Sequence, residues 1–150
     1  MKFLIQRVKN ASVEIHSEIY SQIEKGFLVL VGITDTDTKE IADKMIQKMI
    51  GLRIFEDENG KTNLSLKDVE GDLLIVSQFT LYADCKKGNR PSFIKAGNPQ
   101  YANSLYQYIL EKSEQLFGQT VYSGEFGADM KISLVNDGPF TIMLDSNEIC

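Results

Sequence analysis

The sequence predicts a single α+β domain spanning residues 1–150, in which a sheet of short strands is layered against two main helices. A chain of 150 residues is long enough for one sizeable core and short for two domains. Several segments alternate apolar and polar residues with the two-residue period of a strand that buries one face. Two other segments repeat apolar residues with the helical period. These patterns predict roughly seven to nine strands and two helices.

The first part of the chain contains only predicted strands. Residues 2–8 are apolar and rich in strand-forming types. Residues 11–15 and 18–23 predict a hairpin around His16-Ser17. Residues 26–33, GFLVLVGI, are almost continuously apolar, which is typical of a strand buried on both faces.

A first helix is predicted after this apolar run. Asp37 is the expected N-cap, because Glu40 three positions later completes a capping-box pattern. One apolar stripe follows, made of Ile41, Ala42, Met45, Ile46, Met49 and Ile50. We expect this stripe in the core. A short strand at residues 52–55 and a turn at residues 57–60 come next.

The second helix has clear signals at both ends. It is preceded by a buried strand at residues 73–76 that continues into Ser77–Leu81, and by a polar loop at residues 83–97. Asn98 is the expected N-cap and Pro99 the first helical residue. The helix should end at Phe117, before Gly118. Its inward residues are Ala102, Leu105, Tyr106, Ile109, Leu110 and Leu116.

Residues 130–145, MKISLVNDGPFTIMLD, predict two strands separated by a sharp break. Apolar and polar residues alternate on both sides of the segment Asn136–Pro139. Pro139 donates no backbone hydrogen bond and restricts Gly138, so the ladder must be interrupted there. By composition alone the segment is an ordinary turn, although an X-Pro bond is the kind of peptide bond with a realistic chance of being cis.

The distribution of charge singles out one basic segment as a candidate binding surface. The formal net charge of −5 argues against a broadly basic nucleic-acid-binding surface. Residues 85–110 nevertheless contain Lys86, Lys87, Arg90 and Lys95 and no acidic residue. This basic segment fits either a polyanionic partner or a solvated loop, and charge does not decide between them.

Several kinds of site are excluded or disfavoured by the residue inventory. Cys85 and Cys150 lack the spacing of a zinc or redox motif, so no metal or other cofactor is expected. The single histidine, His16, lies in a predicted turn, which leaves no base for a Ser-His or Cys-His arrangement. No segment has the length of a membrane span or of a signal-peptide apolar region, and we expect a cytoplasmic protein.

Ser77, Gln78, Phe79 and Thr80 are the remaining candidates for chemistry. They directly follow a buried strand, at the rim of a sheet where sites are often built. Their hydroxyl and amide groups can position a ligand, and free backbone N–H groups there can bind an oxyanion. The alternative is a polar strand end without function.

Two motifs together resemble a known family. SQFTL at Ser77–Leu81 and NDGPFT at Asn136–Thr141, about sixty residues apart, resemble the signature motifs of the bacterial and eukaryotic D-aminoacyl-tRNA deacylases. QRV at Gln6–Val8, the GFLVLVGI run and KKGNRPSF at Lys86–Phe93 also fit this family. The resemblance covers essentially the whole chain. It implies a mostly antiparallel sheet with barrel-like layers.

The resemblance implies hydrolysis of the ester between a D-amino acid, or mischarged glycine, and the terminal adenosine of tRNA. It also implies a homodimer with its site at the interface. Gly138 and Pro139 would form a cis peptide that reaches into the partner's pocket and blocks L side chains. Such selectivity excludes the wrong stereoisomer without gripping the right one.

Residue roles follow from the same resemblance. The backbone N–H groups of Phe79 and Thr80 would bind the oxyanion, while Ser77 and Gln78 would position ester and water. Thr80 as a covalent nucleophile is the alternative.

Supporting roles fall to Arg7, Asn136 and Thr141 around the Gly-Pro segment, and tRNA phosphates would meet Lys86, Lys87 and Arg90. Two rival functions remain open, a non-catalytic binder of tRNA ends and another hydrolase that uses the Thr80 hydroxyl.

Overall fold

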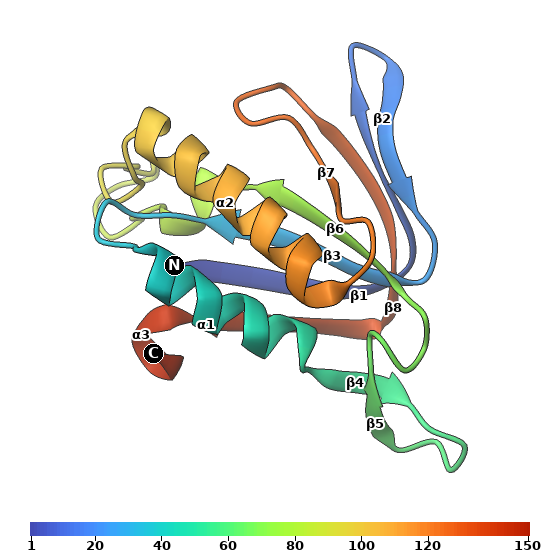
Figure 1. Ribbon diagram of the computed structural model, residues 1–150. Coiled ribbons are helices and arrows are strands. Elements are labelled where there is room, and N and C mark those ends of the chain that lie inside the picture. The colour runs from blue at the N-terminus through green and yellow to red at the C-terminus, as the bar shows by residue number, and fades with distance from the viewer.

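A six-stranded mixed sheet, curled almost into a barrel, forms the centre of the computed structural model, which describes residues 1–150 (Figure 1). Its strands are β1 (Lys2–Ile15), β2 (Glu18–Ile23), β3 (Gly26–Gly32), β6 (Asp72–Ser77), β7 (Tyr122–Ser123) and β8 (Lys131–Asp145). A separate two-stranded sheet consists of β4 (Arg53–Glu56) and β5 (Thr62–Ser65). The helices are α1 (Lys39–Ile50), α2 (Pro99–Phe117) and the short α3 (Ser146–Ile149). The predicted α+β single domain is confirmed.

Strand β1 connects the whole sheet. One of its edges pairs with β3 along residues 2–8 and with β2 along residues 11–15, while the other edge pairs with β8. The two strands predicted at residues 2–8 and 11–15 are therefore one strand. The predicted hairpin to β2 is present, and both of its turn residues, His16 and Ser17, have positive φ.

The directions of the strands place the ends of β3 and β6 together. These two strands pair in parallel, as do β6 and β7, whereas the other pairs are antiparallel. The mostly antiparallel arrangement is thus confirmed, with two parallel pairs that local sequence patterns did not predict. Because carboxyl ends of parallel strands meet at one edge, Val31 of β3 lies opposite Ser77 of β6.

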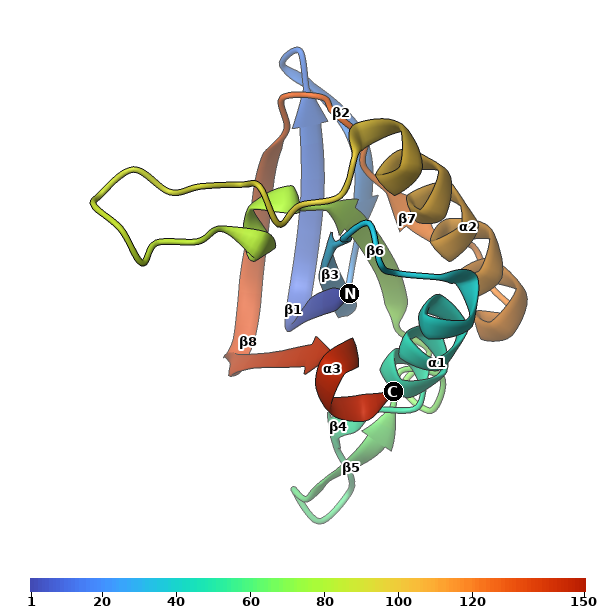
Figure 2. The ribbon, with the colours of Figure 1, turned by 90° about the vertical axis from the view of Figure 1, so that its left-hand side faces the viewer.

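Apolar side chains form two cores, one on each face of the sheet. The larger core lies under α1 and α2, which both cover the same face (Figure 2). The smaller core fills the curl of the sheet and includes Val8, Val13, Leu28, Leu74 and Val76. A hydrogen bond from the Ser21 hydroxyl to the Ser123 carbonyl, 2.7 Å, links β2 to β7 where the curl closes.

Helix α2 begins and ends as predicted. The Asn98 side chain accepts hydrogen bonds from the N–H groups of Gln100 and Tyr101, and Gly118 takes the left-handed conformation (φ 75°). None of the helices in the structure is long and apolar enough to cross a membrane.

The predicted N-cap of α1 is wrong. Thr38, not Asp37, caps the helix and accepts a hydrogen bond from the N–H of Ile41. The buried Asp37 carboxylate instead forms an ion pair with the amino group of Met1, with 2.6 Å between nitrogen and oxygen. Since this partner is distant in the sequence, the local capping pattern did not reveal it.

The break at Gly138-Pro139 is a bulge within one strand and not a turn between two strands. Thr141 pairs with Gln6 and Asn136 pairs with Val8, so residues 137–140 stand opposite Arg7 alone. Both flanks of the break run in the same direction along β1. The predicted interruption of the ladder is present, but the chain does not reverse.

Candidate active site

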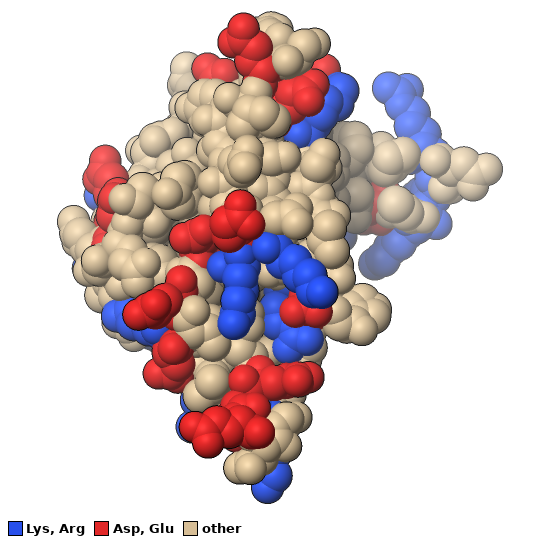
Figure 3. Space-filling view, turned by 90° about the vertical axis from the view of Figure 1, so that its right-hand side faces the viewer, with Lys and Arg blue, Asp and Glu red and all other residues tan.

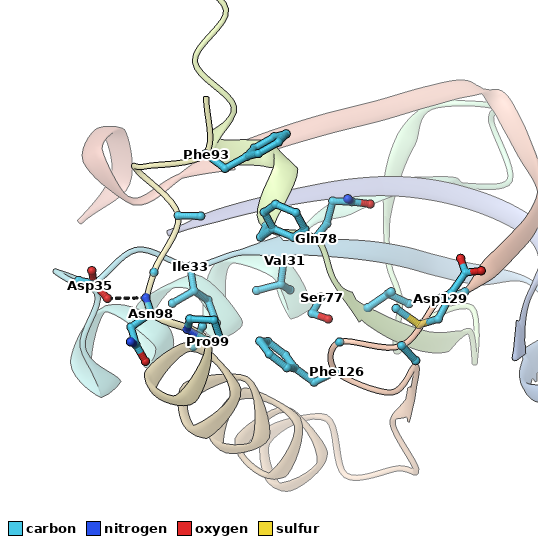
Figure 4. Close-up of a pocket in the computed structure, with 18 of the residues that line it drawn as sticks. Val31, Ile33, Asp35, Ser77, Gln78, Phe93, Asn98, Pro99, Phe126 and Asp129 are labelled. Carbon is cyan, nitrogen blue, oxygen red and sulfur yellow. Dashed lines mark hydrogen bonds between the residues drawn. The ribbon is translucent and has the colours of Figure 1, made fainter. Parts of the chain in front are cut away.

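The main cavity, about 860 Å³, lies where β3 and β6 end (Figure 4). Its walls come from the loop after β3, the N-terminus of α2, the segment before α2, and the segment between β7 and β8. The lining includes Val31, Ile33, Asp35, Ser77, Gln78, Phe79, Phe93, Asn98, Pro99, Phe126, Asp129 and Met130. Three of the four predicted catalytic residues, Ser77, Gln78 and Phe79, therefore lie on the cavity wall.

The backbone after β6 leaves two N–H donors free of the local turn. The Gln78 N–H continues the ladder by donating to the Val31 carbonyl at 2.7 Å. A 3₁₀ turn (Phe79–Tyr82) then begins, and its first hydrogen bond joins the Leu81 N–H to the Gln78 carbonyl at 3.3 Å. The N–H groups of Phe79 and Thr80 precede that bond, so the turn itself supplies them with no acceptor.

Thr80 is exposed and does not line the cavity. Its hydroxyl accepts a hydrogen bond from the side-chain amide of Gln78. Since that contact fixes the Gln78 amide at the cavity edge, the Thr80 side chain orients a neighbour there.

Three phenylalanines give the cavity aromatic walls. Phe79 and Phe93 meet edge to face with their ring centroids 5.1 Å apart. Phe126, on the segment between β7 and β8, lies across the cavity from Phe93 (Figure 4). Both Phe79 and Phe93 remain partly exposed and can contact a flat ligand. Sequence reasoning did not single out Phe126, although the flanking Gly124 and Gly127 signal an irregular segment there.

Arg7 fills the space opposite the bulge in β8. This buried side chain donates from Nε to the Asp137 carbonyl at 2.9 Å and from a terminal nitrogen to the Ile54 carbonyl at 2.6 Å. Its guanidinium carbon also lies 4.5 Å from the centre of the Phe140 ring. These contacts hold the bulge on the body of the protein.

The bulge itself is tightly built. The Gly138–Pro139 peptide bond is cis, and Gly138 has a φ of 145°, which favours glycine. The Asn136 side chain accepts from the Phe140 N–H at 2.6 Å and donates to the Thr141 hydroxyl at 3.1 Å. Gly138 and Pro139 are exposed and do not line the main cavity of their own chain.

The basic segment lies on a loop that projects from the body of the protein (Figure 2). Lys86, Lys87 and Arg90 are exposed and form no ion pair, whereas Lys95 pairs with Asp84 at 3.0 Å. The backbone N–H of Lys86 and the ammonium of Lys95 hold the pKa of Asp84 below its usual value. The face shown in Figure 3 instead carries acidic and basic side chains intermixed.

The structure also bears on two other kinds of site, one based on histidine and one based on a metal ion. His16 is exposed in the turn between β1 and β2, and it does not line the main cavity. No group of three or more His, Cys, Asp or Glu side chains is arranged to hold a metal ion.

Comparisons with known proteins place the chain in one family. Residues 4–145 match the family model described as D-Tyr-tRNA(Tyr) deacylase. The chain is 55% identical to a D-aminoacyl-tRNA deacylase of Flavobacterium psychrophilum over 97% of both chains. It is 48% identical to a D-aminoacyl-tRNA deacylase of Thermosipho melanesiensis over 99% of both.

Solved structures agree with this result. The fold matches a protein described as c-Myc DNA Unwinding Element Binding Protein, with a TM-score of 0.92 and 40% identity over 97% of this chain and 98% of the other. It also matches a probable eukaryotic D-amino acid tRNA deacylase, with a TM-score of 0.85 and 20% identity over 95% and 97%, which supports the fold alone. The family model and the two curated relatives show that the chain belongs to the D-Tyr-tRNA(Tyr) deacylase family.

Proposed function

We propose that the protein hydrolyses the ester bond between a D-amino acid and the terminal adenosine of tRNA, releasing both. Family membership and high identity to D-aminoacyl-tRNA deacylases over the full chain support this activity. The structural observation that carries it is the pair of free N–H groups at Phe79 and Thr80, next to Ser77 and Gln78 on the wall of a large cavity. A cavity of about 860 Å³ has room for a nucleoside with an attached aminoacyl group.

In the proposed mechanism, the two free N–H groups stabilise the charge that develops on the ester carbonyl oxygen. Gln78 and Ser77 hold the ester and the attacking water in line. The water oxygen bonds to the carbonyl carbon, and the bond from that carbon to the ribose 3′-oxygen breaks. The water proton passes to the 3′-oxygen, with the neighbouring 2′-hydroxyl as shuttle. An ester is activated enough for positioning and oxyanion stabilisation to provide much of the acceleration.

Thr80 acts in this mechanism through its backbone N–H and through Gln78. A nucleophilic hydroxyl requires a neighbouring base. The hydrogen-bond partner of the Thr80 hydroxyl is the Gln78 amide, which is not a base. The position of Thr80 therefore favours the non-covalent route.

Chiral selection is assigned to Gly138 and Pro139 acting across a homodimer. Both residues are exposed and absent from their own cavity, which leaves them free to enter the cavity of a second copy. Close to the bulge, Leu4 pairs with Leu30 on one side and with Met143 on the other, and Met143 is 44% exposed. This partly exposed apolar row suits contact with a partner subunit.

The braced backbone of the bulge would occupy the space that an L side chain needs. A D side chain points elsewhere and glycine has none, so mischarged glycyl-tRNA is also a substrate in this proposal. Lys86, Lys87 and Arg90 would contact tRNA phosphates. A cytoplasmic location of the reaction is part of this proposal. The proposed chemistry uses no cofactor.

The decisive experiment compares time courses of matched D- and L-aminoacyl-tRNA and of glycyl-tRNA with the purified protein. We expect the D-aminoacyl and glycyl esters to be cleaved and the L ester to persist. Equal cleavage of D and L esters would refute the selectivity. Binding without cleavage would instead identify a tRNA-end-binding protein. Sedimentation should give twice the mass of one chain, and a fully active monomer would contradict the shared site.

A further inference from the structure

A second cavity, about 380 Å³, adjoins the main one. It lies between the segment after β3, the end of the 3₁₀ turn and the short helix α3. Its polar lining includes Asp35, Thr36, Tyr82, Lys95, Ser146 and Asn147. A volume of this size accommodates one nucleoside.

Three chain segments contribute to both cavities: the segment after β3, the 3₁₀ turn and the segment before α2. Asp35 lines both and forms the shared wall, and Figure 4 shows it at one end of the main cavity, where it accepts a hydrogen bond from the Asn98 N–H at 2.7 Å. Phe79 and Tyr82 are the two ends of one 3₁₀ turn, with Phe79 in the first cavity and Tyr82 in the second. Likewise Lys95 lines the second cavity, and the following Ala96 lines the first. The two cavities are therefore neighbours, with Asp35 between them.

The second cavity contains unused hydrogen-bonding capacity. Tyr82 is 8% exposed, and its hydroxyl has no hydrogen-bond partner in the structure. Burial and the nearby carboxylates of Asp37 and Asp145 raise the pKa of Tyr82, so the hydroxyl stays a neutral donor. A buried hydroxyl without a partner is costly, and a polar guest relieves that cost.

The chemistry of the lining suits a nucleobase. The Asp35 carboxylate accepts hydrogen bonds, and the Thr36 hydroxyl and the Asn147 amide both donate and accept. The Lys95 ammonium pairs with Asp84 at 3.0 Å but remains exposed, so it can also meet a phosphate. A cytosine presents one amino donor with adjacent acceptors, which this set can match.

We propose that the second cavity binds the penultimate nucleotide of the tRNA acceptor end, a cytidine, while the terminal adenosine occupies the main cavity. This inference rests on the proposed function, because it takes the main cavity as the site of the aminoacylated adenosine. Lys95 contacts the phosphate that joins the two nucleotides, and Asp35 separates their bases.

The test compares two substrates that differ in the presence of this nucleotide, D-tyrosyl-tRNA and the D-tyrosyl ester of adenosine alone. Asn147→Ala and Thr36→Ala remove polar groups of the second cavity only. Each should raise KM for D-tyrosyl-tRNA roughly three- to tenfold, the loss expected for one or two hydrogen bonds, and leave hydrolysis of the adenosine ester unchanged. Asn147→Trp, which fills the cavity, should have a larger effect of the same kind. Asn59→Ala, an exposed asparagine in a distant turn, is the matched control.

A tRNA that carries an abasic site at the penultimate position gives an independent readout. Cleavage by the parent protein should fall at least to the level of the Asn147→Ala variant, and the difference between parent and variant should disappear on the abasic tRNA. Equal rates on abasic and intact tRNA, or variants that affect both ester substrates alike, would overturn the subsite. Absence of cleavage of every D-tyrosyl ester by the parent protein would contradict the proposed function instead.

Discussion

The guanidinium of Arg7 donates a hydrogen bond to the backbone carbonyl of Asp137, 130 positions later in the chain, at a distance of 2.9 Å. Arg7 is the residue of β1 that stands opposite the bulge of β8, and no residue of β8 pairs with it in the ladder. Its side chain thus links β1 to β8 at the position where the backbone pairing between the two strands is interrupted. The shape of the bulge therefore depends on one side chain from the other strand.

Replacement of Arg7 by lysine should loosen the bulge even though the charge is kept. A lysine lacks the planar fork that reaches the carbonyls of Asp137 and Ile54 together, so at least one buried carbonyl loses its donor. We expect the free energy of unfolding to fall by about 2–3 kcal/mol and the ratio of D- to L-ester cleavage to fall with it. Chemical denaturation and matched time courses measure both. The exposed Arg53→Lys serves as control, and an unchanged Arg7→Lys variant would show that the brace is dispensable.

Gly138→Ala should disturb the bulge through both conformation and contact. The φ of 145° is strained for a residue with a side chain, at a cost of about 1–3 kcal/mol. The added methyl carbon would also lie 3.0 Å from the Phe140 nitrogen and 3.2 Å from an Arg7 guanidinium nitrogen. We expect reduced activity on D-aminoacyl-tRNA or reduced rejection of the L ester.

Gly60→Ala is the matched control for this change. Gly60 also has a positive φ, 74°, but nothing lies within 4 Å of the added carbon. The Gly60→Ala variant should have a lower free energy of unfolding, but its ratio of D- to L-ester cleavage should equal that of the parent protein. If both variants keep the parent ratio, the bulge is not the selective element.

Replacement of Lys86, Lys87 and Arg90 by alanine should weaken tRNA binding without unfolding the protein, because all three side chains are exposed. Each lost phosphate contact should lower the slope of log affinity against log salt by roughly 0.7–0.9. Binding titrations at several salt concentrations measure this slope. A triple variant at the exposed Lys44, Lys48 and Lys61 changes the charge equally and should leave it unaltered. A normal slope in the loop variant would mean that tRNA docks elsewhere.

Thr80→Ala separates the two roles of this residue. The N–H survives the change and only the contact with the Gln78 amide is lost. Deacylation should therefore remain within about tenfold of the parent rate. A covalent role predicts instead a loss of roughly 10⁴-fold or more, with an acyl-enzyme that mass spectrometry can trap in the parent protein.

The sequence predicted those elements whose signals are local. Helix α2 is the clearest case, since Asn98, Pro99 and Gly118 define both ends within the helix and its immediate neighbours. The N-cap of α1 was mispredicted because the Asp37 carboxylate pairs with Met1, a contact that depends on the tertiary fold. The segment at Gly138-Pro139 contains ordinary turn residues, and only the pairing of both flanks with β1 distinguishes a bulge from a turn.

In the candidate site, too, only the residues with a local sequence signal could be predicted. Ser77, Gln78 and Phe79 could be found because polar residues directly follow an apolar strand. Phe126 and Asp35 belong to segments far apart in the sequence, and the sheet topology brings them to the same cavity. The parallel pairing of β3 with β6, which no local pattern specifies, is what aligns these segments.

The pairing of both flanks of the bulge with β1 also limits which insertions and deletions the chain can accept. Side chains alternate between the two faces of a strand, so one residue added or removed between Asn136 and Thr141 would turn one whole flank over. Ile142 and Leu144 would then leave the large core, or Ile132 and Leu134 the small one. The length of this segment is therefore fixed by the cores on either side of it. The projecting loop at residues 83–97 has no such constraint on its tip, and changes in chain length should accumulate there.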